Sequence, residues 1–282
     1  MMQEAKTSPR FAALIFAAVV LLFLPTWLWL GDAWLSDPYY SHGPLVLLIS
    51  LYFVWARRKV FADHAPAPNN WGLVLVVGAL AAHLWATAWR AYYISASMIP
   101  LALLGLLIAL FGWQIARRFL FPLGFLIFMV PLPLAERFGP LLEGWTTTSA
   151  TAFAQFVGVA ARNDGSQVFL PNSTFTVGIP CGGLRSAIAI MTLVTLWVYI
   201  VHARAWARGI VLLAAIPIAL AANTLRITLL FAIASAWGAE VGLDYFHSWS
   251  SPVLFLLAFA LLLALARVLG ASRVRWEVVA PS

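Results

Sequence analysis

The chain has 282 residues, of which 63% are hydrophobic and only 10% are charged. A soluble domain carries about 25% charged residues, so this composition excludes an ordinary water-soluble protein and predicts an integral membrane protein. The net charge of +7 does not indicate nucleic-acid binding, because the basic residues stand in small groups between apolar runs and form no basic domain or stripe.

Apolar runs follow one another along most of the chain. A helix needs about 20 apolar residues to cross the hydrocarbon of a bilayer, and eight runs approach or reach that length. These candidate spans are residues 11–30, 43–56, 71–89, 95–113, 119–134, 182–201, 209–233 and 250–268. We therefore predict an all-α integral membrane protein with about eight transmembrane helices. We expect one polytopic membrane domain over residues 1–282, with no separate soluble domain.

The basic residues predict the orientation of these spans. Twelve of the 17 Lys and Arg residues fall on the side of the N-terminus when eight spans are threaded. They are Lys6, Arg10, Arg57, Arg58, Lys59, Arg117, Arg118, Arg204, Arg208, Arg267, Arg273 and Arg275. Because cytoplasmic loops are enriched in Lys and Arg, we expect both termini in the cytoplasm. No small-residue cleavage site follows the first apolar run, so we expect a retained first helix.

The segment 138–161 is too polar for a simple lipid-facing span, since it is rich in Thr, Ser, Ala and Gly. Its place between two outward ends predicts a helix at the outer interface or packed within the bundle. Residues 162–165 (Arg-Asn-Asp-Gly) are typical of a turn. Residues 168–170 and 175–177 flank Pro-Asn-Ser and predict a short outer hairpin that leads into Cys181.

Cys181 is the only cysteine, so it has no partner for an internal disulfide. We expect it in the first turn of the helix that begins near residue 182. There the unsatisfied N–H groups, together with the cation of Arg185 one turn later, would favour the thiolate. A lone cysteine is more often a small buried apolar residue, and Arg185 could equally be an interfacial cation. The surroundings of Cys181 favour a reactive role.

Asn223 and Arg226 lie within the apolar run 209–233 and share a helix face, being three residues apart. An arginine inside a span is costly and is a functional candidate by default. The alternative is a buried arginine that ties helices together. We expect Arg226 to reach the outer level of the membrane, where it would stabilise an oxyanion with Asn223 beside it.

Two histidines are expected at the same outer level. His247 precedes the last span, within an aromatic stretch that would also suit an interfacial belt. His42 precedes the second span and is a second candidate base or a supporting residue. Both side chains are able to accept and donate a proton near neutral pH.

At these residues the sequence resembles the exosortase/archaeosortase family. The matching pieces appear in the family's order over about residues 37–250. They are Tyr-Ser-His-Gly at 40–43, Pro-Leu-Pro at 131–133, the hairpin running into Cys181, Gly-Leu-Arg-Ser at 183–186, Asn223 with Arg226, and His247.

The resemblance implies a cysteine transpeptidase of PEP-CTERM-type protein sorting in the bacterial cytoplasmic membrane, with its site facing outward. The family's Cys-Arg-His constellation falls on Cys181, Arg226 and His247, within the catalytic segments 163–251, with Asn223, Arg185 and His42 in support. The implied partners are the lipid bilayer and membrane-anchored substrate proteins, whose C-terminal signal combines a short motif, a transmembrane helix and a basic tail. We expect no cofactor, metal or nucleic acid.

Two alternatives stay open. A transporter or channel would use Arg226 to line a pathway and would tolerate loss of the thiol, although most spans are apolar at their centres. A membrane acyl- or glycosyltransferase would use His42 or His247 as base and would need no cysteine.

Overall fold

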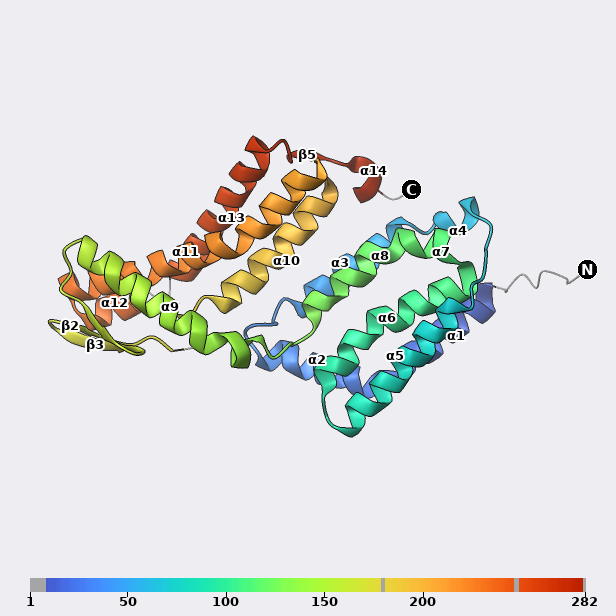
Figure 1. The fold of residues 1–282 in the computed structure, drawn as a ribbon, viewed down its shortest axis with the longest axis horizontal. Coiled ribbons are helices and arrows are strands. Elements are labelled where there is room, and N and C mark those ends of the chain that lie inside the picture. Colours follow the sequence, from blue (N-terminus) through green and yellow to red (C-terminus); the bar gives the residue numbers. More distant parts are fainter. Residues whose placement is uncertain (1–8, 179–180, 246–248, 281–282) are drawn as a thin grey trace, which may run out of the picture. The chain divides into compact units, whose positions relative to one another are not determined.

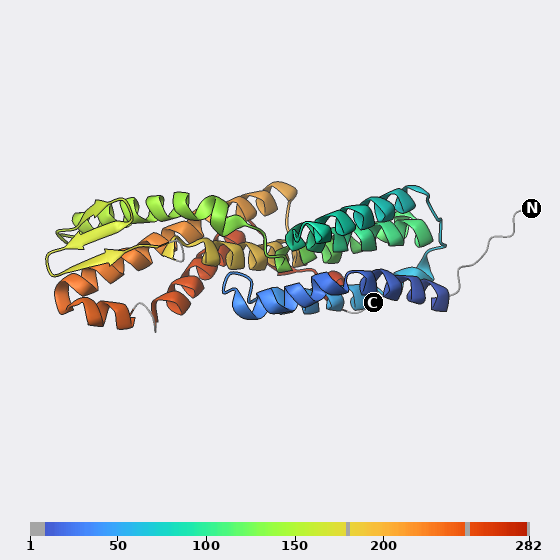
Figure 2. The ribbon, with the colours of Figure 1, turned by 90° about the horizontal axis from the view of Figure 1, so that it is seen from below.

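The computed structural model describes residues 9–178, 181–245 and 249–280. The chain divides into two compact units, and each is described by itself (Figures 1 and 2). Unit 1 comprises residues 1–132 and 276–282, and unit 2 comprises residues 133–275. That these units work as one membrane domain stays a prediction.

In the part that the structure describes, unit 1 has helices and connecting loops but no strand. Its elements are α1 (Pro9–Leu22), α2 (Leu24–Ser36), α3 (Gly43–Ala56), α4 (Val60–Asp63), α5 (Trp71–Ala88), α6 (Tyr92–Phe111), α7 (Trp113–Ala116), the 3-10 turns η1 (Arg117–Phe119) and η2 (Leu126–Met129) around α8 (Leu120–Phe125), and the C-terminal α14 (Trp276–Val279). Helix α6 packs along α5 and also contacts α1, α2 and α8, so it forms the centre of this unit.

The first predicted span is broken. Residues 11–30 were expected to form one helix, but α1 ends at Leu22 and α2 begins at Leu24, with a bend of 61° between them. Pro25 is the physical reason, because it has no N–H to donate to a carbonyl of the preceding turn and instead suits the first turn of a new helix.

Unit 2 contains the remaining long helices and two small sheets. Its elements are α9 (Leu134–Phe156), β1 (Arg162–Asp164), β2 (Gln167–Leu170), β3 (Ser173–Thr176), α10 (Leu184–Ile200), β4 (Val201–His202), α11 (Ala205–Trp237), α12 (Ala239–Tyr245), α13 (Ser251–Val268) and β5 (Arg273–Val274). Helix α11 is the centre of this unit, because α9, α10, α12 and α13 all pack against it.

Helix α9 accounts for the polar segment 138–161. It buries small residues, among them Thr147, Ala150 and Ala154, and it packs against α11. Small side chains let two helices approach closely in a membrane protein. This segment is thus a helix packed against α11, and its depth relative to the membrane stays a prediction.

The expected hairpin is a three-stranded antiparallel sheet, β1-β2-β3. The prediction of a turn at residues 162–165 was wrong for the first three of them, which form β1. Asp164 pairs with Gln167, so the two-residue loop is Gly165-Ser166, and Gly165 takes the positive φ of 60° that such loops favour. Val168 and Phe175 face inward onto a cluster with Phe231 of α11.

The fold class is confirmed: this is an all-α membrane protein with little sheet. Four helices of the described chain, α5, α6, α11 and α13, are long and apolar enough to span a membrane, and up to six spans result if each of two helix pairs interrupted by a short break is counted as one. Helices α3 and α10 coincide closely with the predicted spans 43–56 and 182–201. The count of eight spans stays a prediction.

Candidate active site

Cys181 lies in unit 2, at the point where the three-stranded sheet leads into α10. The residue is partly buried, and it packs at the edge of the apolar cluster formed by the sheet, α9 and α11. The prediction that Cys181 belongs to the first turn of the helix was wrong by a few residues, because α10 begins at Leu184 with Gly183 as its N-cap. Cys181 therefore sits just before the helix N-terminus.

Gly183 determines where the helix starts. Its φ of 84° is in the left-handed region, which residues with a Cβ rarely adopt, so the α-helix cannot extend back to Cys181. A Cβ on Gly183 would also lie 2.8 Å from Cγ of Asn223. Glycine at this position thus provides both the turn behind Cys181 and the close approach of α11.

Asn223 holds the cysteine segment in place. Its Nδ2 donates to the Cys181 carbonyl oxygen over 2.8 Å and to Oγ1 of Thr146 over 3.4 Å. Thr146 in turn donates to the carbonyl oxygen of Gly182 at 3.4 Å. Both amide hydrogens of Asn223 are thus directed at the protein, and they hold the backbone at Cys181. The expected part of Asn223 in stabilising an oxyanion stays a prediction.

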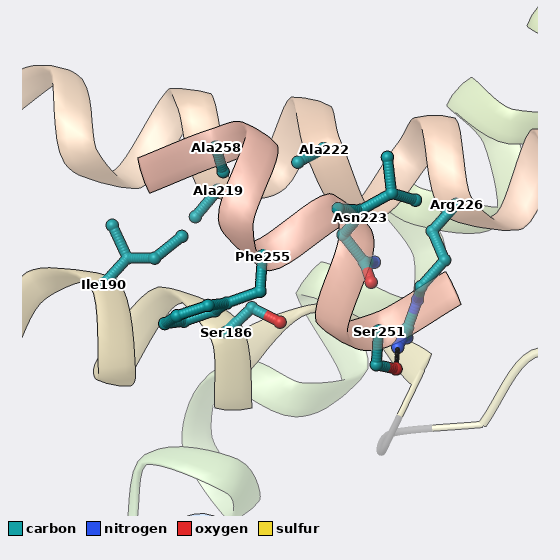
Figure 3. A pocket seen from close by; sticks show the side chains of 10 residues that line it. Ser186, Ile190, Ala219, Ala222, Asn223, Arg226, Ser251, Phe255 and Ala258 are labelled. Carbon is teal, nitrogen blue, oxygen red and sulfur yellow. Dashed lines mark hydrogen bonds between the residues drawn. The ribbon is translucent and has the colours of Figure 1, made fainter. Parts of the chain in front are cut away.

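Arg226 lies one helical turn after Asn223 and is brought near Cys181. The guanidinium interacts electrostatically with Cys181 and with Arg185, and its Nη1 donates to Oγ of Ser251 at 2.7 Å. That hydrogen bond ties α11 to the first residue of α13 (Figure 3). Arg185 is exposed at the start of α10, and it adds a second positive charge to this end of the unit.

Sequence reasoning missed two residues of this arrangement, Thr146 and Ser251. Thr146 belongs to the Thr-Thr-Thr run 146–148, whose small hydroxyls were the signal, but the register of α9 against α11 decides which of them faces Asn223. Ser251 lies at the start of the last apolar run, and only the folded chain places it against Arg226.

His42 belongs to unit 1, where it immediately precedes α3. Its ring is half-buried and stacks on that of Tyr40, and Tyr40 donates to the carbonyl oxygen of Leu132 at 3.1 Å. Burial lowers the pKa of His42, and a hydrogen bond with the backbone of Phe128 raises this pKa in part. Within unit 1, the Tyr-Ser-His-Gly piece of the sequence therefore contacts Leu132 of the Pro-Leu-Pro piece.

The third residue of the predicted constellation, His247, lies outside the described residues. Within the described ranges, no group of three or more His, Cys, Asp or Glu side chains is arranged to hold a metal ion. The structure thus brings together Cys181, Asn223, Arg226 and Arg185.

Comparison with known proteins agrees with the resemblance seen in the sequence. Neither the curated proteins nor the solved structures contain a match. A family model described as transmembrane exosortase matches residues 34–264, which is most of the chain and includes every residue of the candidate site. Membrane-embedded sorting transpeptidases make up this group, and the chain belongs to the transmembrane exosortase family.

Proposed function

We propose that this protein is a cysteine transpeptidase that cleaves membrane-anchored proteins at a C-terminal sorting signal and transfers them to an acceptor. The observation that carries the proposal is the position of the only cysteine, just before the N-terminus of α10 and within electrostatic range of Arg226. A thiol beside a fixed cation, in a chain of the exosortase family, is suited to nucleophilic attack on a carbonyl group.

In the proposed reaction, His247 takes the proton of the Cys181 thiol, and the sulfur attacks the carbonyl carbon of the scissile peptide bond. The C–S bond forms, and the negative charge on the carbonyl oxygen is stabilised by Arg226, a contribution of about 3–4 kcal/mol for one donor in a site of low dielectric. His247 then gives its proton to the leaving nitrogen as the C–N bond breaks. The resulting thioester passes its acyl group to an amine, a hydroxyl group or water.

The substrates that we propose carry a short motif, a transmembrane helix and a basic tail. Anchoring by a helix fixes the depth of the scissile bond and so reduces the search for the thiol. The distribution of Lys and Arg supports an orientation in the bacterial cytoplasmic membrane with both termini inside and Cys181 outside.

The experiment that tests the proposal is co-expression of Cys181→Ala with an anchored substrate of this kind. We expect complete loss of the cleaved product, read by mass spectrometry, because the nucleophile is removed. A Cys181→Ser variant should retain a substrate fragment as an ester, since an ester is less reactive toward acceptors than a thioester. Membrane insertion and thermal unfolding of both variants are the controls. Undiminished cleavage by Cys181→Ala would exclude the thiol mechanism.

A further inference from the structure

Helices α10, α11 and α13 enclose a pocket beside Arg226 in unit 2 (Figure 3). One end is polar and is lined by Ser186, Asn223, Arg226 and Ser251. The other end is apolar, and alanines form much of its wall. The pocket therefore combines a hydrogen-bonding end with a small apolar recess.

Asn223 presents an unused acceptor to this pocket. Because the Cys181 carbonyl can only accept, the amide must turn Nδ2 toward it, and this leaves Oδ1 facing away from the cysteine. Oδ1 is shielded from solvent and has no hydrogen-bond partner among the described residues, in a side chain that is 3% exposed. In Figure 3 this oxygen points toward the space between Ser186 and Ser251.

A buried acceptor without a partner is unusual in a native protein and calls for an explanation. The missing partner must be a donor, because Oδ1 has no hydrogen to give. A protonated amine is disfavoured by the neighbouring cation of Arg226, and a phosphate or carboxylate has no hydrogen for Oδ1. A peptide bond supplies an N–H for Asn223 and, one residue away, a carbonyl for Arg226.

The direction of the helices indicates which part of a substrate would lie at this pocket. Helices α10 and α13 both begin at the polar end of the pocket, and the alanines Ala219 and Ala258 lie further along the apolar helices α11 and α13. The recess thus extends away from Cys181 into the apolar part of the unit. A substrate held by its own transmembrane helix would direct the anchor side of its scissile bond this way.

Building on the proposed function, we infer that Asn223 is a substrate-positioning residue whose Oδ1 accepts an N–H from the substrate main chain on the anchor side of the scissile bond. The residue next to this N–H lies against the alanines of the pocket. One amide group thus holds the nucleophile segment through Nδ2 and the substrate through Oδ1. Loss of either contact misplaces the sulfur relative to the carbonyl carbon.

The test is a semisynthetic substrate in which the first intact peptide bond on the anchor side is replaced by an ester, which removes one N–H. We expect kcat/KM of the wild-type protein to fall about tenfold for this ester. The Asn223→Ala variant should process the amide and the ester at equal rates. The control substrate carries the ester on the opposite side of the scissile bond. Any change in kcat/KM caused by this ester should be the same in the wild-type protein and in Asn223→Ala.

If Asn223→Ala is too slow to assay, binding replaces cleavage as the readout. In the Cys181→Ala background, the same tenfold difference between amide and ester should appear in Kd, and it should vanish when Asn223→Ala is added. A second arm fills the apolar end of the pocket: Ala222→Leu should raise KM for the anchored substrate, because the added side chain blocks the approach to Asn223. The exposed neighbour Ala221 lies outside the pocket, so Ala221→Leu should not.

Equal processing of amide and ester by the wild-type protein would overturn this inference, because the pocket would then hold only water. Cleavage itself would continue in that case, and the proposed function would stand. If the wild-type protein cleaves neither substrate, both proposals fall.

Discussion

Each unit contains a buried polar group that donates to a carbonyl oxygen beside an interruption of regular structure. In unit 1, Nε2 of His83 bonds to the carbonyl oxygen of Leu22 at 3.1 Å, where α1 breaks. In unit 2, Nδ2 of Asn223 bonds to the carbonyl oxygen of Cys181 at 2.8 Å, just before α10 begins. Both side chains thus stabilise backbone that lacks a helical partner, which is costly at membrane depth.

The two groups differ in what remains unbonded. Nδ1 of His83 bonds to Ser95 at 2.7 Å, and Ser95 bonds to Thr26 at 2.5 Å, so both ring nitrogens have partners within the unit. Asn223 instead keeps one buried acceptor open beside a cation and a thiol. The hydrogen-bond network of His83 has all its partners and therefore specifies packing. The unpaired Oδ1 of Asn223 can still accept a hydrogen bond from a substrate. From this comparison we propose a role in stability for His83 and a role in substrate positioning for Asn223.

The largest effect is expected at Arg226. The change Arg226→Lys keeps the charge but removes the planar fork that contacts Ser251, and lysine cannot offer the same paired donors to an oxyanion. We expect the cleavage rate to fall about a hundredfold or more, measured with an anchored substrate in reconstituted membranes.

Arg185→Lys is the matched control for Arg226→Lys, because this arginine is exposed and is expected to act only through its charge. The cleavage rate of Arg185→Lys should stay within about twofold of the wild-type rate. Equal losses of cleavage rate in the two variants would show that Arg226 acts only through its charge. Unit 2 would then contain no specific donor arrangement that sets it apart from unit 1.

The next effect concerns His83 in unit 1. The change His83→Leu leaves the Leu22 carbonyl and the Ser95 hydroxyl without their partner, and unsatisfied buried groups cost about 1–3 kcal/mol each. We expect the free energy of unfolding to fall by about 3 kcal/mol, measured by denaturation in detergent micelles. The cleavage rate of the protein that remains folded should be unchanged.

Asn223→Leu provides the opposite case, since it should reduce cleavage strongly at a smaller cost in stability. His83→Gln should recover part of the stability, because an amide supplies both a donor and an acceptor. If His83→Leu abolished cleavage without changing the free energy of unfolding, the hydrogen-bond network of His83 would have a role in the reaction, contrary to the comparison above.

The sequence predicts the long helices well, for a physical reason. An apolar run of sufficient length must form a helix in a bilayer, so the prediction for α3, residues 43–56, agrees with the observed Gly43–Ala56. The same reasoning fails where a local feature interrupts the run. Pro25 divides the first span, and the left-handed Gly183 delays the start of α10, although both signals were present in the sequence.

The candidate site is predictable only in part. The charge of Arg226 inside an apolar run and the single thiol of Cys181 mark both residues as candidates from the sequence alone. Their partners depend on tertiary register, because Thr146 is one of three consecutive threonines and Ser251, the first residue of α13, closely follows two other serines in the sequence. The open Oδ1 of Asn223 depends on which way its amide is turned, and no sequence pattern specifies that.

The smallest effect is expected at His42, a half-buried polar residue of unit 1 outside the membrane spans. Its pKa is lowered from the ordinary value of 6.5, mainly by burial. Below that pH the unfolded chain binds the proton more readily than the folded protein does, so stability falls as the pH decreases. The contribution of a neutral His42 is therefore complete above pH 6.5 and is lost as the pH falls through the lower pKa of the folded state.

The change His42→Asn removes the titrating group and keeps a side chain that can donate to the Phe128 backbone. We expect the wild-type protein to lose stability more steeply than His42→Asn between about pH 7 and pH 5, measured as unfolding midpoints in the same micelles. His83→Gln is not a suitable control, because it alters the network of unit 1. His202→Asn is the better control, because His202 is exposed. Parallel pH profiles for wild-type and His42→Asn would mean that burial does not disfavour the charged form of His42 in the folded protein.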